Sequence, residues 1–394
     1  MSEDIAMTRE IALVCAAKTA RTFCYGFLGI LLPVYLTELG VGAAGVGVAV
    51  TLTLAASAAL TWAVRRPAER YGARAALLGL AALTMVGGLL LLASRHPWLV
   101  VLGAMLGNVA VGSGETGPFL TIEQVVIARA VTGQRRTAVF SVYNLIGYGA
   151  AGLGAAVAGV ASNYQTLFLV FVAGTILQLA VYWRLPAGPG VANVRAAAPL
   201  VSAPLIRRMA VLFSLDSFAG GFVLQSLIAY FLHTRFGLTL ADLGLVFLAA
   251  QLLTAASLLL AAPLAHRFGL LPTMVVSHLI SNVLLIAIAV APSAAVAIAL
   301  LLGRQLLSQI DVPTRQAYVM AVVEDHEREA AASLTTLTRT VAQAVSPALT
   351  GWTMQALAMG APFVLGGGLK MLYDLLLYFT FKDVKLKSER TQDR

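Results

Sequence analysis

The chain has 394 residues, of which 59% are hydrophobic and only 11% are charged, and its formal net charge is +9. Its mean hydropathy of +0.85 lies far outside the range of water-soluble globular domains, because so few charged residues cannot cover a water-facing surface. Composition therefore excludes a soluble enzyme domain and predicts that lipid surrounds most of the molecule.

Apolar runs of about twenty residues follow one another along the chain, which is the length that a helix needs to cross a bilayer. They are continuous and rich in Leu, Ala and Val, whereas a membrane β-barrel shows alternating segments of about ten residues. The predicted fold class is an all-α polytopic membrane protein with twelve transmembrane helices, at residues 11–36, 41–64, 74–94, 98–122, 138–160, 164–183, 209–232, 238–262, 270–291, 294–314, 331–357 and 362–381.

The basic residues predict the orientation of these spans. No cleavable signal peptide is recognised before the first span, so we expect it to be retained. With the N-terminus in the cytoplasm, the inward-facing segments hold 20 of the 27 Lys and Arg residues, and the outward-facing loops hold only Arg95 and Arg235. We therefore expect a multi-pass protein of the plasma (inner) membrane with both termini in the cytoplasm. This asymmetry accounts for the net charge without a nucleic-acid partner.

A charged turn between the second and third spans has a counterpart in the second half of the chain. The stretch "RRPAERYGAR" covers residues 65–74, and "LAHRFG" follows at 264–269, an offset of 197 residues. The segments 40–50 and 237–247 match at the same offset. Such a repeat is typical of transporters built from two similar halves. We predict two parallel six-helix halves, at 1–183 and 209–394, joined by a cytoplasmic linker at 184–208.

The turn resembles the loop motif of the major facilitator superfamily, G-x-x-x-D-R-x-G-R-[RK], with Glu69, Arg70, Gly72 and Arg74 at matching positions and Arg65 in place of the first glycine. The resemblance covers the whole chain and implies the fold of that family. It also implies that Glu69 lies near the start of the eleventh helix and that Arg70 pairs with an acid at the cytoplasmic end of the fourth helix, where Glu123 is available. This cluster would act as a latch between the halves. The plainer interpretation is a charged turn that only fixes topology.

Polar and ionisable side chains inside the spans are costly in lipid and usually face a cavity or a partner. The resemblance implies that spans one, four, seven and ten line a central cavity. The candidate substrate-binding residues are Lys18, Arg21, Tyr25, Asn108, Glu115, Asp216, Arg304 and Arg339.

Each candidate also has a structural interpretation. Lys18 could extend to the membrane surface, and Glu115 and Asp216 could form structural ion pairs. We expect Lys370 to pair with Asp374, and His278 to form a hydrogen bond between helices. Asp311 and Arg315 are four residues apart on one helix and are expected to pair as well.

The sequence shows no phosphate-binding loop and no Cys/His cluster with metal-ligand spacing, so no cofactor or metal is predicted and the protein is not expected to be an enzyme. A secondary transporter draws on a gradient, and protons are the natural driver because buried carboxylates can carry them. Glu115 and Asp216 are the candidate proton carriers.

The predicted function is secondary active transport by alternating access, with proton-coupled efflux of small anionic or amphipathic organic compounds by a monomer. The fifth span, "GYGAAGLGAAVAG", is glycine-rich like that of the drug/proton antiporters of this family, but it has no proline. Two alternatives remain: an uptake permease of the same fold, and a membrane receptor or scaffold that transports nothing.

Overall fold

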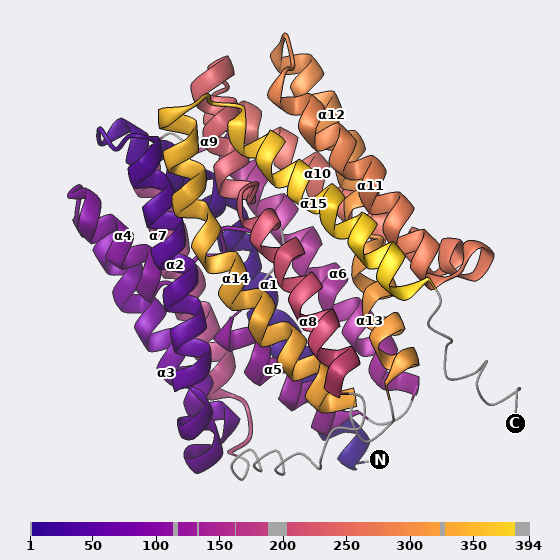
Figure 1. Ribbon diagram of the computed structural model, residues 1–394. Helices are drawn as coiled ribbons and strands as arrows, with labels where there is room; N and C mark the ends of the chain where they lie inside the picture. The colour runs from indigo at the N-terminus through magenta and orange to yellow at the C-terminus, as the bar shows by residue number, and fades with distance from the viewer. Residues whose placement is uncertain are drawn as a thin grey trace, which may run out of the picture. The chain divides into compact units, whose positions relative to one another are not determined.

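The computed structural model describes residues 2–112, 117–131, 134–161, 163–187, 203–323 and 328–382. These residues are folded almost entirely into helices (Figure 1). In chain order the helices are α1 (Ser2–Glu38), α2 (Ala43–Ala63), α3 (Arg65–Ala93), α4 (Pro97–Leu106), α5 (Pro118–Ala130), α6 (Gln134–Val157), α7 (Tyr164–Trp183), α8 (Ala203–Gly221), α9 (Gln225–Phe236), α10 (Leu240–Phe268), α11 (Leu270–Ala289), α12 (Ala294–Ser308), α13 (Asp311–Val322), α14 (Arg328–Ala356) and α15 (Ala361–Phe381).

The predicted all-helical membrane fold is confirmed. Within the described residues, nine candidate spans are long and apolar enough to cross a membrane. The helices α4 and α12 are shorter apolar helices. Nine of the twelve predicted spans correspond to single helices, and the fourth, seventh and tenth each correspond to two consecutive helices.

The internal repeat is visible in the backbone as well as in the sequence. Gly72 and Gly269, 197 residues apart, both have a φ of 86°, and Gly40 and Gly237, also 197 residues apart, have φ values of 84° and 68°. Residues with a side chain rarely adopt this conformation, so glycine at these four positions allows the same turn to form twice. Gly72 interrupts α3, and Gly269 precedes α11.

The chain divides into two compact units. Unit 1 contains Met1–Val194 and Leu224–Gln251, and unit 2 contains Arg195–Val223 and Leu252–Arg394. Residues 188–202, most of the predicted linker, lie outside the described part of the chain. The division at 184–208 therefore stays a prediction.

In unit 1, α1 packs against α6, α7 and α9. The contact with α6 is close because Gly26 faces the carbonyl of Ala151 and Gly154 faces the carbonyl of Phe23, so a methyl group at either glycine would clash with backbone. In unit 2, α8 packs against α14 and α15, and α11 packs against α12, α13 and α15. These contacts place side chains from distant parts of the sequence beside one another in each unit.

Candidate functional site

Three of the predicted spans are interrupted near their centres. The fourth is divided between α4 and α5, the seventh between Gly221 and Gln225, and the tenth between Ser308 and Asp311. A broken helix leaves backbone N–H and C=O groups without partners inside the helix, and such breaks mark binding sites in membrane transporters. The polar positions predicted on these spans therefore lie next to unpaired backbone groups.

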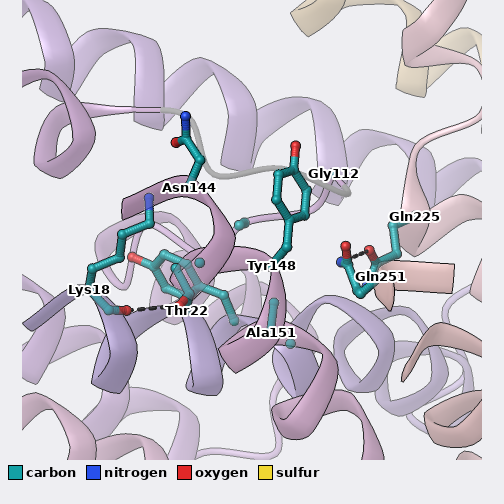
Figure 2. A pocket seen from close by; sticks show the side chains of 12 residues that line it. Lys18, Thr22, Gly112, Asn144, Tyr148, Ala151, Gln225 and Gln251 are labelled. Atoms are coloured by element: carbon teal, nitrogen blue, oxygen red, sulfur yellow. Dashed lines mark hydrogen bonds between the residues drawn. The ribbon is translucent and has the colours of Figure 1, made fainter. Parts of the chain in front are cut away.

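A pocket lies in unit 1, among α1, α6, α9, the start of α10 and the segment after α4 (Figure 2). It contains about 550 Å³ of space, which is a typical size for a small-molecule site. Its described lining residues are Lys18, Thr22, Tyr25, Gly26, Ala110, Gly112, Asn144, Gly147, Tyr148, Ala151, Gln225 and Gln251.

Lys18 is the cation among the described lining residues, and none of them is acidic. The side chain is 3% exposed, and its Nζ lies 3.7 Å from the centre of the Tyr143 ring, a cation–π contact. Gly147 on α6 leaves the space that the Lys18 stem occupies, because a Cβ there would lie 2.5 Å from Lys18 Cε. The packing thus holds the ammonium group at the pocket instead of letting it extend to the membrane surface.

Two glutamines close another side of the pocket. Gln251 Nε2 donates a hydrogen bond to Gln225 Oε1 at 3.1 Å, and Gln251 Oε1 has no partner among the described residues. Ser226 binds the carbonyls of Gly29 and Val111 through its hydroxyl, at 2.7 and 3.1 Å. The start of α9 is therefore fixed against α1, with a free acceptor at the pocket.

Arg21, predicted to bind substrate, lies instead in a buried ion pair. Its guanidinium donates two hydrogen bonds to Glu123 on α5, at 3.0 and 2.6 Å. Tyr143 and Tyr182 each donate a further bond of 2.5 Å to the same carboxylate. Arg21 is not among the residues that line the pocket. It is placed to hold α1 against α5, and the acid predicted for Arg70 is occupied by Arg21.

The loop motif lies at the surface of unit 1. Glu69 and Arg70 are exposed, and the guanidinium of Arg70 lies 5.3 Å from the centre of the Tyr71 ring. Arg74 lies 5.0 Å from the Trp183 ring. These contacts, together with the positive φ of Gly72, give the motif a structural role in ending one turn and starting α3. The latch between the halves stays a prediction.

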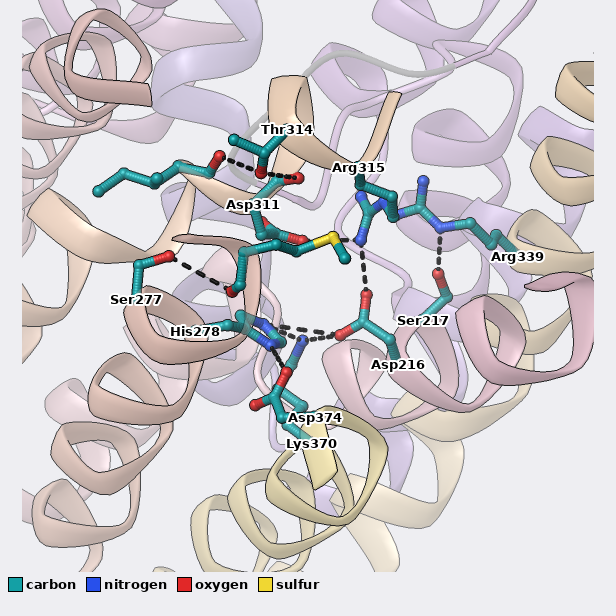
Figure 3. A network of polar contacts seen from close by, with 12 residues as sticks. Asp216, Ser217, Ser277, His278, Asp311, Thr314, Arg315, Arg339, Lys370 and Asp374 are labelled. Carbon is teal, nitrogen blue, oxygen red and sulfur yellow. Dashed lines mark hydrogen bonds and ion pairs between the residues drawn. The ribbon is translucent and has the colours of Figure 1, made fainter. Parts of the chain in front are cut away.

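Unit 2 contains a second buried charge cluster, centred on Asp216 (Figure 3). One carboxylate oxygen accepts a bond from Lys370 Nζ at 2.6 Å, and the other from Arg315 at 3.2 Å. Arg315 also binds Asp311 at 2.7 Å, so the pairing predicted from their spacing is confirmed. Asp216 thus connects α8 to α13 and α15.

Asp374 has different partners from those predicted. His278 Nδ1 lies 2.7 Å from one oxygen of Asp374, and Asn282 donates to the other at 2.9 Å. Lys370, the expected partner of Asp374, pairs with Asp216. The predicted hydrogen bond of His278 between helices is confirmed, since α11 and α15 meet at this contact.

The remaining candidates lie apart from the pocket. Arg339 donates to Ser217 Oγ at 2.9 Å, and Arg304 donates to Gln305 Oε1 at 2.9 Å. Asn108 is buried beyond the end of α4, with a φ of 48°. Glu115 lies outside the described residues. Only Lys18 and Tyr25 of the predicted substrate-binding residues line the pocket.

Sequence reasoning missed four polar lining residues: Asn144, Tyr148, Gln225 and Gln251. A signal was available for the amides, because Asn and Gln within an apolar span are as unusual as charges. The search for ionisable groups passed over them.

These features define a class: a polytopic helical membrane protein with paired halves, interrupted spans and an internal polar pocket, as in secondary transporters. The family model of the Major Facilitator Superfamily matches residues 14–309 and 217–394, so the chain belongs to that superfamily.

Similar proteins cover nearly the whole chain. The uncharacterized membrane protein YJR124C of Saccharomyces cerevisiae is 22% identical over 98% of this chain and 97% of its own length. The structure of the human organic anion transporter MFSD10 (TETRAN) has a TM-score of 0.67 at 15% identity, covering 94% of this chain and 99% of that one. The nucleoside transporter NupG has a TM-score of 0.73 at 13% identity, covering 95% and 99%. At these identities the two structures show the fold alone.

Proposed function

We propose that this protein is a secondary active transporter that carries small organic anions, and that the pocket of unit 1 is its substrate site. The observation that carries the proposal is the charge of the lining: Lys18 is present, and no described lining residue is acidic. An anion in this pocket would meet an ammonium group already freed of most of its water. A bound cation would meet only repulsion.

The backbone adds to this preference. Gln225, at the first position of α9, lines the pocket, and a helix N-terminus carries a partial positive charge that favours anions. Two phenol rings, Tyr25 and Tyr148, offer apolar surface with a polar end. Aromatic monocarboxylates combine the charge and the ring that such a pocket accepts. We therefore name benzoate as the probe and benzamide as its neutral analogue of the same shape.

The experiment is counterflow into proteoliposomes. Vesicles loaded with unlabelled benzoate should accumulate labelled benzoate transiently when they contain the protein, and labelled benzamide should not accumulate. Lys18→Met should lower the apparent affinity by about 10- to 100-fold, since a charged hydrogen bond contributes about 1.5–3 kcal/mol. Lys18→Arg keeps the charge and is the matched control. Counterflow of benzamide equal to that of benzoate would contradict the proposal.

Direction and coupling are part of the same proposal: proton-coupled efflux of the drug/proton-antiporter type, by a monomer in the plasma (inner) membrane with both termini in the cytoplasm. The glycine-rich α6 supports efflux, and the distribution of Lys and Arg supports the orientation. Benzoate flux in oriented vesicles, under imposed pH gradients of either sign, separates efflux from uptake. Binding of benzoate without counterflow would favour the receptor alternative.

A further inference from the structure

His278 on α11 lies between a buried acid and a buried base. Its Nδ1 is 2.7 Å from Asp374 Oδ1, and its Nε2 is 3.4 Å from Lys370 Nζ and 3.7 Å from Asp216 Oδ1 (Figure 3). The ring is 4% exposed and meets the edge of the Tyr373 ring. No part of the proposed substrate pocket includes it.

The partners fix the proton of the neutral ring. A lysine ammonium only donates hydrogen bonds, so Nε2 must accept from Lys370, and the proton then resides on Nδ1 and points at Asp374. In this state Lys370 lies between His278 Nε2 and Asp216 Oδ1 and satisfies both.

The other charges near the ring are already paired or lie beyond its reach. Arg315 on α13 binds both Asp216 and Asp311, and Arg339 on α14 binds Ser217. On α12, Arg304 binds Gln305. The imidazole is the group in this cluster whose ordinary titration range is closest to neutral pH.

We propose that His278 is a proton-binding site, and that a proton on its Nε2 competes with Lys370 for Asp216 Oδ1. A protonated ring is a donor at both nitrogens, so it would keep Asp374 and turn from accepting the Lys370 bond to repelling that cation. The nearest acceptor for the new N–H is Asp216 Oδ1, which Lys370 occupies. One proton therefore exchanges the partner of Asp216 between α15 and α11.

The exchange acts on α8. Asp216 is followed by Ser217, whose hydroxyl receives the bond from Arg339 on α14. A change of partner at Asp216 thus alters how α8 is held by α11, α14 and α15 together. The use of this site to drive transport rests on the proposed function, but the proton site itself does not.

The direct test is ¹⁵N NMR of the full-length protein in nanodiscs with labelled histidine. The chain has five histidines, and His278 is identified by the signal lost in His278→Gln. If that variant does not fold, replacing His96, His233, His266 and His326 leaves His278 as the sole signal. We expect the Nδ1–H tautomer at about pH 8 and the doubly protonated ring at about pH 5. An Nε2–H tautomer, or a ring that keeps one state across this range, would overturn the proposal.

Two substitutions test the competition. Asp374→Asn removes an anion beside the ring and Lys370→Met removes a cation, so they should move the titration midpoint in opposite directions, each by about one pH unit. Asp242→Asn, at the start of α10 and outside the cluster, is the matched control and should leave the midpoint in place. Shifts of both variants in one direction, or of neither, would contradict the competition.

A transport measurement separates this inference from the proposed function. His278→Gln should lose accumulation of benzoate driven by a pH gradient, relative to its own counterflow rate. Absence of benzoate counterflow in the unmodified protein overturns the proposed function and leaves the NMR result decisive for the proton site. Gradient-driven accumulation retained in His278→Gln shows that the site does not drive transport.

Discussion

Arg21 and Glu123 are 102 residues apart in the chain and form an ion pair closed to water. Arg21 is 2% exposed and Glu123 is fully buried, and both carboxylate oxygens are bound. Unit 2 has an ion pair on equivalent helices with the opposite polarity, since Asp216 follows Arg21 at an offset of 195 and pairs with Arg315 on α13. Each unit thus ties its first span to its fourth by one buried charge pair.

The first prediction concerns the cost of breaking this pair. Arg21→Met should destabilise the protein by about 3–5 kcal/mol, because it leaves a buried carboxylate uncompensated. The double variant Arg21→Met/Glu123→Gln should recover a large part of that loss, since it removes both charges. The measurement is the midpoint of thermal unfolding in detergent. A double variant less stable than Arg21→Met would show that the charge pairing is not what the single substitution disturbs.

The second prediction concerns the position of Lys18. Gly147→Ala places a methyl group 2.5 Å from Lys18 Cε, so the flexible side chain must move while the helices stay in place. We expect weaker benzoate binding, by about tenfold, with little change in thermal stability. Gly149→Ala on the same helix is the matched control, because nothing lies within 4 Å of its added Cβ. Binding measured by scintillation proximity decides it, and equal affinities for the two variants would contradict the argument.

The third prediction tests the charge of the pocket. Gln251→Glu introduces an acid among the lining residues and should reduce benzoate affinity at least about tenfold by repulsion. Benzamide is uncharged, so any weak binding of it should change little. Gln251→Met, similar in length without the charge, separates electrostatics from the lost hydrogen bond to Gln225. If Gln251→Glu and Gln251→Met weaken benzoate equally, charge does not select the ligand.

The fourth prediction concerns the repeated turn. Gly72→Ala and Gly269→Ala should each cost about 1–2 kcal/mol, because both backbones have a φ of 86° that a Cβ disfavours. Gly79→Ala, in the helical part of α3 with open space around its Cβ, should stabilise the protein by up to about 1 kcal/mol. Unfolding midpoints of the three variants in one detergent provide the comparison. A stable Gly269→Ala would mean that the second copy of the turn is not under the same constraint.

The sequence by itself determined the membrane environment, the helical class and the repeat. These depend on local properties, since about twenty apolar residues span a bilayer whatever their neighbours are. The Asp311–Arg315 pair could also be predicted, because residues four apart share a helix face. The offset of 197 residues located the two special glycines before their backbone angles were known.

Only the tertiary structure decided which buried groups meet. Arg21 was predicted at the substrate and lies against Glu123, and Lys370 was predicted against Asp374 and lies against Asp216. Helical spacing places a side chain on a face but does not say which distant helix packs against that face. A buried charge takes the partner that packing brings within reach, because the low-dielectric interior makes an unpaired charge so costly. The identity of the pocket was decided in the same way, by where the close contact of α1 with α6 leaves room for Lys18.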